Sequence, residues 1–159
     1  CTISGRVADD AGACAERARS AARRHGVGVA VAGDTAYVGF TELQVLDDHY
    51  EQVRGPIDAR QAHGSAYGLV AAARGYHHPL GDWNFQEVTV IGSRIRVELN
   101  GTVILDADLA LVDPASYMGG REHPGIARTE GFFGFAGHSD PVMFRNVQVR
   151  RTPRERPPA

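Results

Sequence analysis

The sequence predicts an all-β protein built as a sandwich of antiparallel sheets, and three observations lead to this fold class. From Val27 to Arg151 the chain consists of short runs rich in Val, Ile and Phe, which Gly, Asn, Asp and Pro separate at the intervals of β-hairpins. In residues 89–109, TVIGSRIRVELNGTVILDADL, apolar and polar side chains alternate with the period of two that a half-buried strand requires. The same run contains Asn100-Gly101, a pair that type I′ hairpin turns prefer because both turn residues adopt φ > 0.

The composition fits one folded domain. The 159 residues are 43% hydrophobic and 23% charged, which allows a substantial core. The 17 Lys and Arg against 19 Asp and Glu give a formal net charge of -2, so no overall basic field attracts nucleic acid. No stretch approaches the roughly 20 apolar residues that cross a bilayer, and no charged start followed by an apolar run marks a signal peptide. We therefore expect neither a nucleic-acid partner nor a membrane span.

The first 25 residues differ in texture from the rest. Residues 8–24 are rich in Ala and Arg, with Asp9 and Asp10 near the start and Gly26 beyond the end, which are helix signals. We therefore expect residues 1–25 to be a divergent, helix-like N-terminal segment and residues 26–151 to form the β-sandwich. Residues 152–159, which are polar and rich in proline, are expected to be a disordered tail.

The two cysteines, Cys1 and Cys14, say little about the compartment. They are too few for a disulfide framework and lack the spacing of a metal site, although a single bridge between them stays open. A chain that begins at Cys1 is either a fragment or a mature bacterial lipoprotein with a lipid anchor on that cysteine, and we favour the fragment.

The expected strands follow in order along the chain. Residues 40–50, FTELQVLDDHY, read as a strand with Leu43 and Val45 on one face and Glu42 and Gln44 on the other. The hairpin of residues 89–109 alternates in the same way, with an apolar face formed by Ile95, Val97 and Leu99. Residues 131–137, GFFGFAG, and residues 141–151, PVMFRNVQVRR, supply two later strands.

Five short stretches, in this order and spacing, resemble the domain of unknown function 1080 family, whose members have 3-keto-glycoside lyase, hydratase and hydrolase activities. They are the ELQVLD strand of residues 42–47, the GSAYG turn of residues 64–68, the GDWN strand entry of residues 81–84, the LNG hairpin of residues 99–101 and the closing GHSDPVMFRN of residues 137–146. The resemblance runs from about Gly26 to Arg151, and no single motif carries it.

The resemblance implies a concanavalin-like jelly roll, in which two curved antiparallel sheets present a concave face to a sugar. It also implies a bacterial enzyme of carbohydrate metabolism, secreted or periplasmic, that acts on a small-molecule or oligosaccharide substrate. Two features depart from the family pattern. Family members have further strands before this point, so the chain is expected to be truncated or divergent at its N-terminus, and Ala30 stands where an arginine is expected.

The chemistry implied by the resemblance needs a base, a group that stabilises an enediolate oxygen and an acid for the departing alcohol. Glu42, Asp47 and His63 are the catalytic candidates, and a divalent metal ion is a candidate cofactor that could act as the electrophile. The candidates for substrate binding are Gln44, Tyr67, Trp83 and His138.

Each candidate also has a structural interpretation. Asp47 could bond turn backbone, His63 could be a loop residue, and Trp83 could pack in the core. His77, His78 and His123 are interpreted as loop residues that are too widely spaced to define a metal site. Three function classes therefore compete: a 3-keto-glycoside-cleaving enzyme, a non-catalytic carbohydrate-binding module and an inactive truncated fragment.

Overall fold

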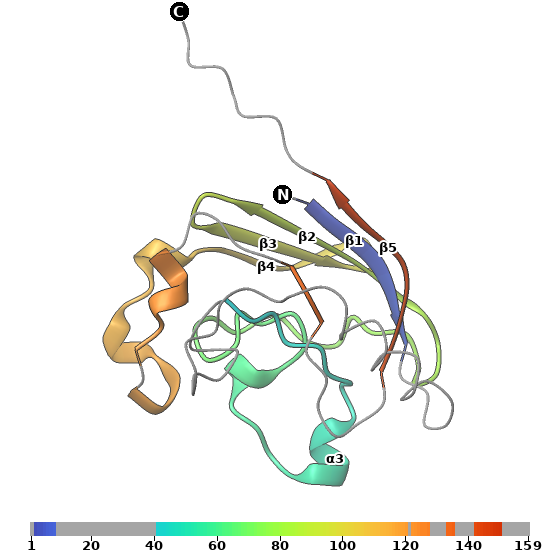
Figure 1. Ribbon diagram of the computed structural model, residues 1–159. Helices are drawn as coiled ribbons and strands as arrows, with labels where there is room; N and C mark the ends of the chain where they lie inside the picture. Colours follow the sequence, from blue (N-terminus) through green and yellow to red (C-terminus); the bar gives the residue numbers. More distant parts are fainter. Residues whose placement is uncertain (1, 9–40, 121, 128–132, 136–141, 151–159) are drawn as a thin grey trace, which may run out of the picture.

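The described part of the chain is built around one five-stranded antiparallel sheet (Figure 1). The structure, a computed structural model, describes residues 2–8, 41–120, 122–127, 133–135 and 142–150. The sheet order is β4-β3-β2-β1-β5. The strands are β1 (Thr2–Ala8), β2 (Asn84–Ile91), β3 (Arg94–Leu99), β4 (Thr102–Asp108) and β5 (Met143–Arg150). The all-β antiparallel class predicted from the sequence is thereby confirmed, and the helical content of the described residues is small.

The predicted hairpin of residues 89–109 is present as β3 and β4. Asn100 and Gly101 have φ values of 51° and 85°, as a type I′ turn requires. Ile95, Val97 and Leu99 are 4%, 0% and 2% exposed, so the apolar face of β3 forms part of the core as expected.

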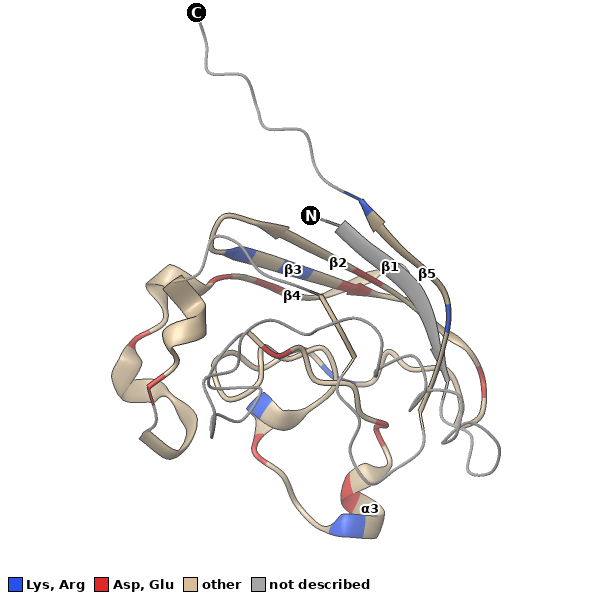
Figure 2. Cartoon of the chain, viewed as in Figure 1, with Lys and Arg blue, Asp and Glu red and all other residues tan. Residues whose placement is uncertain are grey.

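The opposite face of the hairpin carries paired charges (Figure 2). Arg94 Nε lies 2.8 Å from Asp106 Oδ1, and Arg96 Nη2 lies 2.9 Å from Glu98 Oε2. The Asp106 carboxylate has a pKa below its usual value, mainly because Arg94 donates hydrogen bonds to it. Opposite charges on one face of a sheet add little stability in water, but they keep that face polar.

Strand β1 lies inside the sheet, between β2 and β5. It pairs antiparallel with both, from Thr2 opposite Thr89 and Arg150 onwards. This placement differs from the domain boundary predicted at residue 26, which left the whole N-terminal segment outside the sandwich. The remainder of the predicted helix, the strands expected before residue 41, Ala30 and the tail of residues 152–159 lie outside the described residues.

The inner face of the sheet packs on an irregular layer rather than on a described second sheet (Figure 1). The layer contains α3 (Tyr50–Arg54), the short 3-10 helix η1 (Ala59–Gln61) and a buried loop of residues 62–72. The shared core comprises Ala66, Leu69, Ala72, Val88, Ile95, Val97, Leu99, Ile104, Leu105 and Leu109. Four further 3-10 helices follow β4: η2 (Leu109–Leu111), η3 (Pro114–Ser116), η4 (Met118–Gly120) and η5 (Pro124–Ala127).

Of the strand predicted at residues 40–50, residues 41–47 are an extended segment paired with the buried loop. Among its described residues, only Leu43 forms a bridge, to Ala66. Around that bridge, Gln44 N donates to Ser65 O at 3.0 Å and Gly64 N donates to Gln44 O at 2.8 Å. The segment then turns into α3 at Tyr50 instead of continuing as a strand. Of the strand predicted at residues 131–137, residues 133–135 are described and are not in a strand.

Hydrogen bonds from Ser65 and from the neighbouring η1 hold the buried loop in place. Ser65 is fully buried, and its Oγ accepts a hydrogen bond from Ala72 N at 3.0 Å and donates to Ala59 O at 3.3 Å. Asp58 caps η1 and pairs with Arg60, whose guanidinium also donates to Ser116 O. Because a buried loop without such partners would be strongly disfavoured, these bonds explain how irregular backbone can lie under a sheet.

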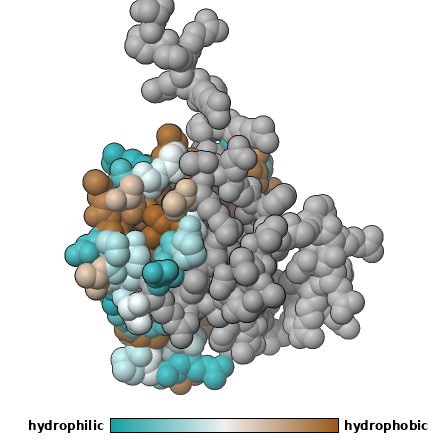
Figure 3. All heavy atoms as spheres, turned by 60° about the vertical axis from the view of Figure 1, so that its left-hand side comes forward, coloured by the Kyte–Doolittle hydropathy of each residue, from teal (hydrophilic) through white to brown (hydrophobic). Residues whose placement is uncertain are grey.

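Exposed apolar side chains also occur in the described part. Ile91 and Leu111 are 62% and 83% exposed. Figure 3 shows brown, apolar side chains gathered among polar ones on one face.

Gly64 allows the buried loop to approach the sheet. Its φ is +74°, and a Cβ at this position would overlap Ile104 Cδ1. We expect Gly64→Ala to lower the free energy of unfolding by about 2–4 kcal/mol, through left-handed strain and overpacking. Chemical denaturation measures this directly.

Gly101→Ala is the matched control, because Gly101 has a φ of +85° and open space around it. It should cost about 1 kcal/mol from backbone strain alone. Adding Ile104→Val to Gly64→Ala removes the overlapping methyl group and should recover part of the loss. Equal costs for the two alanine variants would contradict this packing.

Candidate functional site

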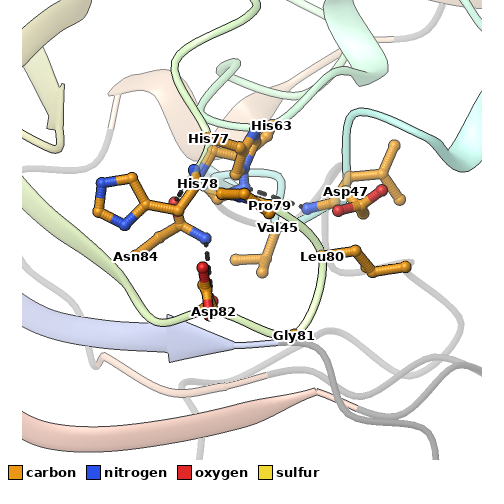
Figure 4. Close-up of a pocket in the computed structure, with 11 residues that line it drawn as sticks. Val45, Asp47, His63, His77, His78, Pro79, Leu80, Gly81, Asp82 and Asn84 are labelled. Atoms are coloured by element: carbon orange, nitrogen blue, oxygen red, sulfur yellow. Dashed lines mark hydrogen bonds between the residues drawn. The ribbon is translucent and has the colours of Figure 1, made fainter.

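A small pocket lies where the extended segment, the buried loop and the loop before β2 meet (Figure 4). Its volume of about 10 Å³ leaves room for about one water molecule. Its lining contains three histidines, two aspartates and one asparagine beside apolar groups: Val45, Leu46, Asp47, His63, His77, His78, Pro79, Leu80, Gly81, Asp82 and Asn84.

His63 is a buried, neutral imidazole in this pocket. The residue is 5% exposed, and its Nδ1 accepts a hydrogen bond from Leu46 N at 3.2 Å. The pKa of His63 is lowered to about 4, mainly by burial and in smaller part by the neighbouring His77, while the Gln86 side chain and Asp48 act in the opposite direction. Because Nδ1 is an acceptor, the proton of the neutral ring resides on Nε2.

His77 lies against His63 and beside Asp48. The two imidazole rings meet edge to face, with centroids 4.4 Å apart and an interplanar angle of 73°. His77 Nδ1 is 3.0 Å from Asp48 Oδ2, and the two side chains are 10% and 24% exposed. The contact has the distance of an ion pair but not the alignment of a hydrogen bond, since Nδ1 has no hydrogen-bond partner in the described part of the chain. Catalytic hydrogen bonds are often misaligned in this way before a substrate binds.

Three buried polar atoms around the pocket have no hydrogen-bond partner among the described residues. They are His63 Nε2, His77 Nδ1 and Gln86 Oε1. The Gln86 amide acts on His63 electrostatically without full hydrogen-bond geometry. Folded proteins leave few buried polar atoms unpaired, and such atoms concentrate where a site serves function rather than stability.

Asn84 and Asn100 fix the loop that carries His77. His78 N donates to Asn84 Oδ1 at 2.8 Å, and Asn100 Nδ2 donates to the same oxygen and to Tyr76 O, each at 2.8 Å. The His78 ring contacts the Trp83 carbonyl, with Nδ1 3.0 Å from that oxygen. The hairpin turn at Asn100 therefore positions both neighbours of His77.

Two of the three predicted catalytic residues, Asp47 and His63, line the pocket together. The Asp47 carboxylate, however, is already bonded by its neighbour. Its Oδ1 accepts from His49 N at 2.6 Å and lies 3.0 Å from His49 Nδ1. Asp47 thus bonds turn backbone, as its structural interpretation predicted.

The other predicted residues do not line the pocket. Glu42 and Gln44 lie on the extended segment, where their backbone groups bond the buried loop. The Tyr67 hydroxyl accepts from Gln61 Nε2 at 2.7 Å. Trp83 has the Arg145 guanidinium 3.8 Å above its ring centroid, so one face of the indole is covered. His138 lies outside the described residues.

The described residues do not fit a divalent cation. No group of three or more His, Cys, Asp or Glu side chains in the described ranges could hold one. His63 is also poorly suited, because Nδ1 is occupied by Leu46 N–H and Nε2 carries the proton. The metal ion expected from the sequence stays a prediction.

The sequence did not single out His77, which lines the pocket, or Asp48 and Gln86, which lie next to its histidines. The pair His77-His78 stands in a loop-like stretch, so nothing in the local pattern separates one from the other. Gln86 did leave a signal, since it shares its strand face with Val88 and so places an amide on the buried side of β2. A polar residue on a core-facing strand position indicates a partner or a site.

The comparisons with known proteins agree with this fold. A family model described as a 3-keto-alpha-glucoside-1,2-lyase-like domain matches residues 17–150. The chain belongs to this family. The family predicted from the sequence is thereby confirmed, and the match extends further toward the N-terminus than the resemblance did.

Two solved structures from Parabacteroides distasonis ATCC 8503, both of proposed glycosyl hydrolases, resemble this domain. The first is 22% identical with a TM-score of 0.65, and the match covers 94% of this chain and 76% of that one. The second is 14% identical with a TM-score of 0.57, and the match covers 92% of this chain and 67% of that one. At these identities the likeness shows the fold alone. The search of curated proteins gave no match, and the described residues contain no helix long and apolar enough to cross a membrane.

We expect the burial of His63 to make the family domain sensitive to mild acid. The folded pKa of about 4 lies below the reference value of 6.5, so the unfolded chain binds more protons between these values. The stabilisation is complete above pH 6.5 and falls as the pH drops towards 4, by up to ~3 kcal/mol. Urea denaturation across this range measures the loss.

His63→Gln is the comparison, because it removes the titrating ring. The difference in unfolding free energy between wild type and variant should shrink as the pH falls from 6.5 to 4. Asp58, whose pKa is lowered to about 2 mainly by hydrogen bonds from the Arg60 side chain, loses its contribution only below this window. A difference that is constant with pH would show that His63 is not buried as a neutral ring.

Proposed function

We propose that this domain cleaves 3-keto-glycosides by removal of the C2 proton, elimination of the C1 substituent and addition of water. The observation that supports the proposal most is the pocket itself, in which the His63 and His77 rings meet edge to face and His77 Nδ1 lies 3.0 Å from the Asp48 carboxylate. The family membership supplies the substrate class.

The chemistry follows from the ketone at C3. The ketone acidifies the hydrogen on C2, so a base of moderate strength can remove it and leave an enediolate. The enediolate expels the C1 alkoxy group, and water can then add at C1 to give net hydrolysis. An imidazole suits the proton transfer because it gains and loses a proton near neutral pH.

The neutral His63 ring suits such a pocket. Its burial disfavours a second positive charge next to His77, so the site does not accumulate charge when a proton is taken up. A poorly solvated surrounding also strengthens electrostatic interactions between the protein and a developing enediolate.

A carbohydrate-binding module is the second candidate, and one observation favours it. The pocket volume of about 10 Å³ accommodates a water molecule rather than a sugar ring. A sugar bound without reaction would rest on the surface around the pocket, where polar contacts each contribute about 1 kcal/mol.

The deciding experiment measures aglycone release from a 3-keto-glucoside in parallel with binding of the unoxidised glucoside. Turnover of the 3-keto substrate is the expected result. Binding of the glucoside without turnover of the 3-keto-glucoside would instead establish the binding module. A parallel assay with chelator tests the metal prediction, since a required divalent ion would make release sensitive to its removal.

Glu42→Gln tests whether the strand residue predicted to be catalytic takes part. The pocket lining does not include Glu42, so we expect the rate of aglycone release to change by less than about tenfold. A general base at this position would cost about 10²-fold to 10⁴-fold. The near-isosteric change preserves packing, and a thermal melt checks that the fold is intact. A loss of about 10²-fold or more in the rate would show instead that Glu42 takes part in the proton transfer.

A further inference from the structure

Two of the acid–base candidates in the pocket are already engaged by neighbouring groups of the protein. His63 uses Nδ1 as an acceptor for Leu46 N–H, and its other nitrogen already carries the proton of the neutral ring. The Asp47 carboxylate binds both the backbone and the ring of His49. The base therefore has to be sought elsewhere in the described lining.

His77 and Asp48 form the arrangement that a proton-accepting imidazole needs. A carboxylate oxygen 3.0 Å from Nδ1 favours a proton on that nitrogen, which leaves Nε2 with its lone pair. His77 lines the pocket, its side chain is only 10% exposed, and the His63 ring packs against it at 4.4 Å. The ring is thus oriented from two sides.

We propose that His77 is the catalytic base of this domain and that Asp48 is its positioning residue. This inference rests on the proposed function. Asp48 acts through His77, by fixing the tautomer and stabilising the imidazolium, and is not itself expected to contact the substrate.

The proton transfer balances without a further reactant. The C2–H bond breaks, its electron pair forms the C2=C3 bond of the enediolate, and the proton moves to His77 Nε2. The C3 carbonyl then re-forms, a C1=C2 double bond forms, and the C1–O bond breaks. The departing oxygen takes a proton from the imidazolium, which restores neutral His77.

The charged and titratable groups around His77 are the carboxylates of Asp48, Asp47 and Asp82 and the imidazoles of His63 and His78. Asp48 makes the direct contact, and the others line the same pocket. Asp48 therefore contacts the His77 ring on one side, and the His63 ring packs against it on another. Replacing the Asp48 carboxylate by an amide should change the pH dependence of kcat, which a merely structural role would not do.

The test uses three variants of the full chain: His77→Ala, Asp48→Asn and His49→Ala. His49 is the matched control, since it is an exposed histidine of the same region and does not line the pocket. We expect His77→Ala to lose about 10²-fold to 10⁴-fold in kcat for aglycone release. Free imidazole in the buffer should restore part of that rate, because the cavity left by the side chain can admit the missing base.

We expect Asp48→Asn to lower kcat by less than His77→Ala, with little change in KM and an altered pH profile.

The outcomes separate this inference from the function on which it rests. A wild type that does not release aglycone overturns both. A wild type that does, together with a His77→Ala variant of equal rate or one that imidazole does not rescue, overturns the inference alone. Should His77→Ala fail to fold in a thermal melt, His77→Gln retains most of the side-chain volume. Undiminished turnover by the glutamine variant would count against His77, and a loss matching the expected range would support it.

Discussion

The structure depends on how the apolar face of the sheet is buried from solvent. Val97 and Leu99 on β3 need cover, and a loop of small residues provides it where a second sheet would be expected. The backbone of that loop can lie so close to the sheet because Gly64 has no side chain. Since most of the loop is buried, the His63 imidazole that it carries is buried too.

The chemistry of the pocket follows from this burial. Desolvation disfavours the charged form of His63, so the ring stays neutral. The neutral ring packs edge to face against His77. Two adjacent histidines then differ in role through their surroundings: one is enclosed with Nδ1 bonded to backbone, and the other faces a carboxylate. Environments that separate similar titratable groups in this way are common where proton transfer is catalysed.

The local parts of this fold could be predicted from sequence, and the long-range parts could not. The alternation of Ile95, Val97 and Leu99 and the Asn100-Gly101 turn are properties of neighbouring residues, and both were predicted correctly. Strand β1 was missed because its partners lie in distant parts of the chain, at β2 and β5. The alternating segment of residues 40–50 was predicted to be a strand, yet its partner is a loop, so pairing stops after one bridge.

In the candidate site, too, the local features could be predicted from sequence and the long-range contacts could not. His63 was predicted from its place in the family-like turn, and Asp47 from its place at the end of the predicted strand, whereas the contact of His77 with Asp48 arises only when two loops fold together. No spacing rule links these two residues, because their contact depends on the bonds that Asn84 and Asn100 make to the loop that carries His77. Burial and tautomer, which distinguish His63 from His77, are likewise properties of the folded state.

The most direct test of this account is the ionisation and tautomer of the two histidines, which nitrogen NMR of the imidazole rings reports. The account predicts that His63 stays neutral with its proton on Nε2 until the pH approaches about 4, while His77 carries its proton on Nδ1 when neutral. A His63 resonance that titrates near 6.5, or a His63 ring protonated on Nδ1, would contradict it.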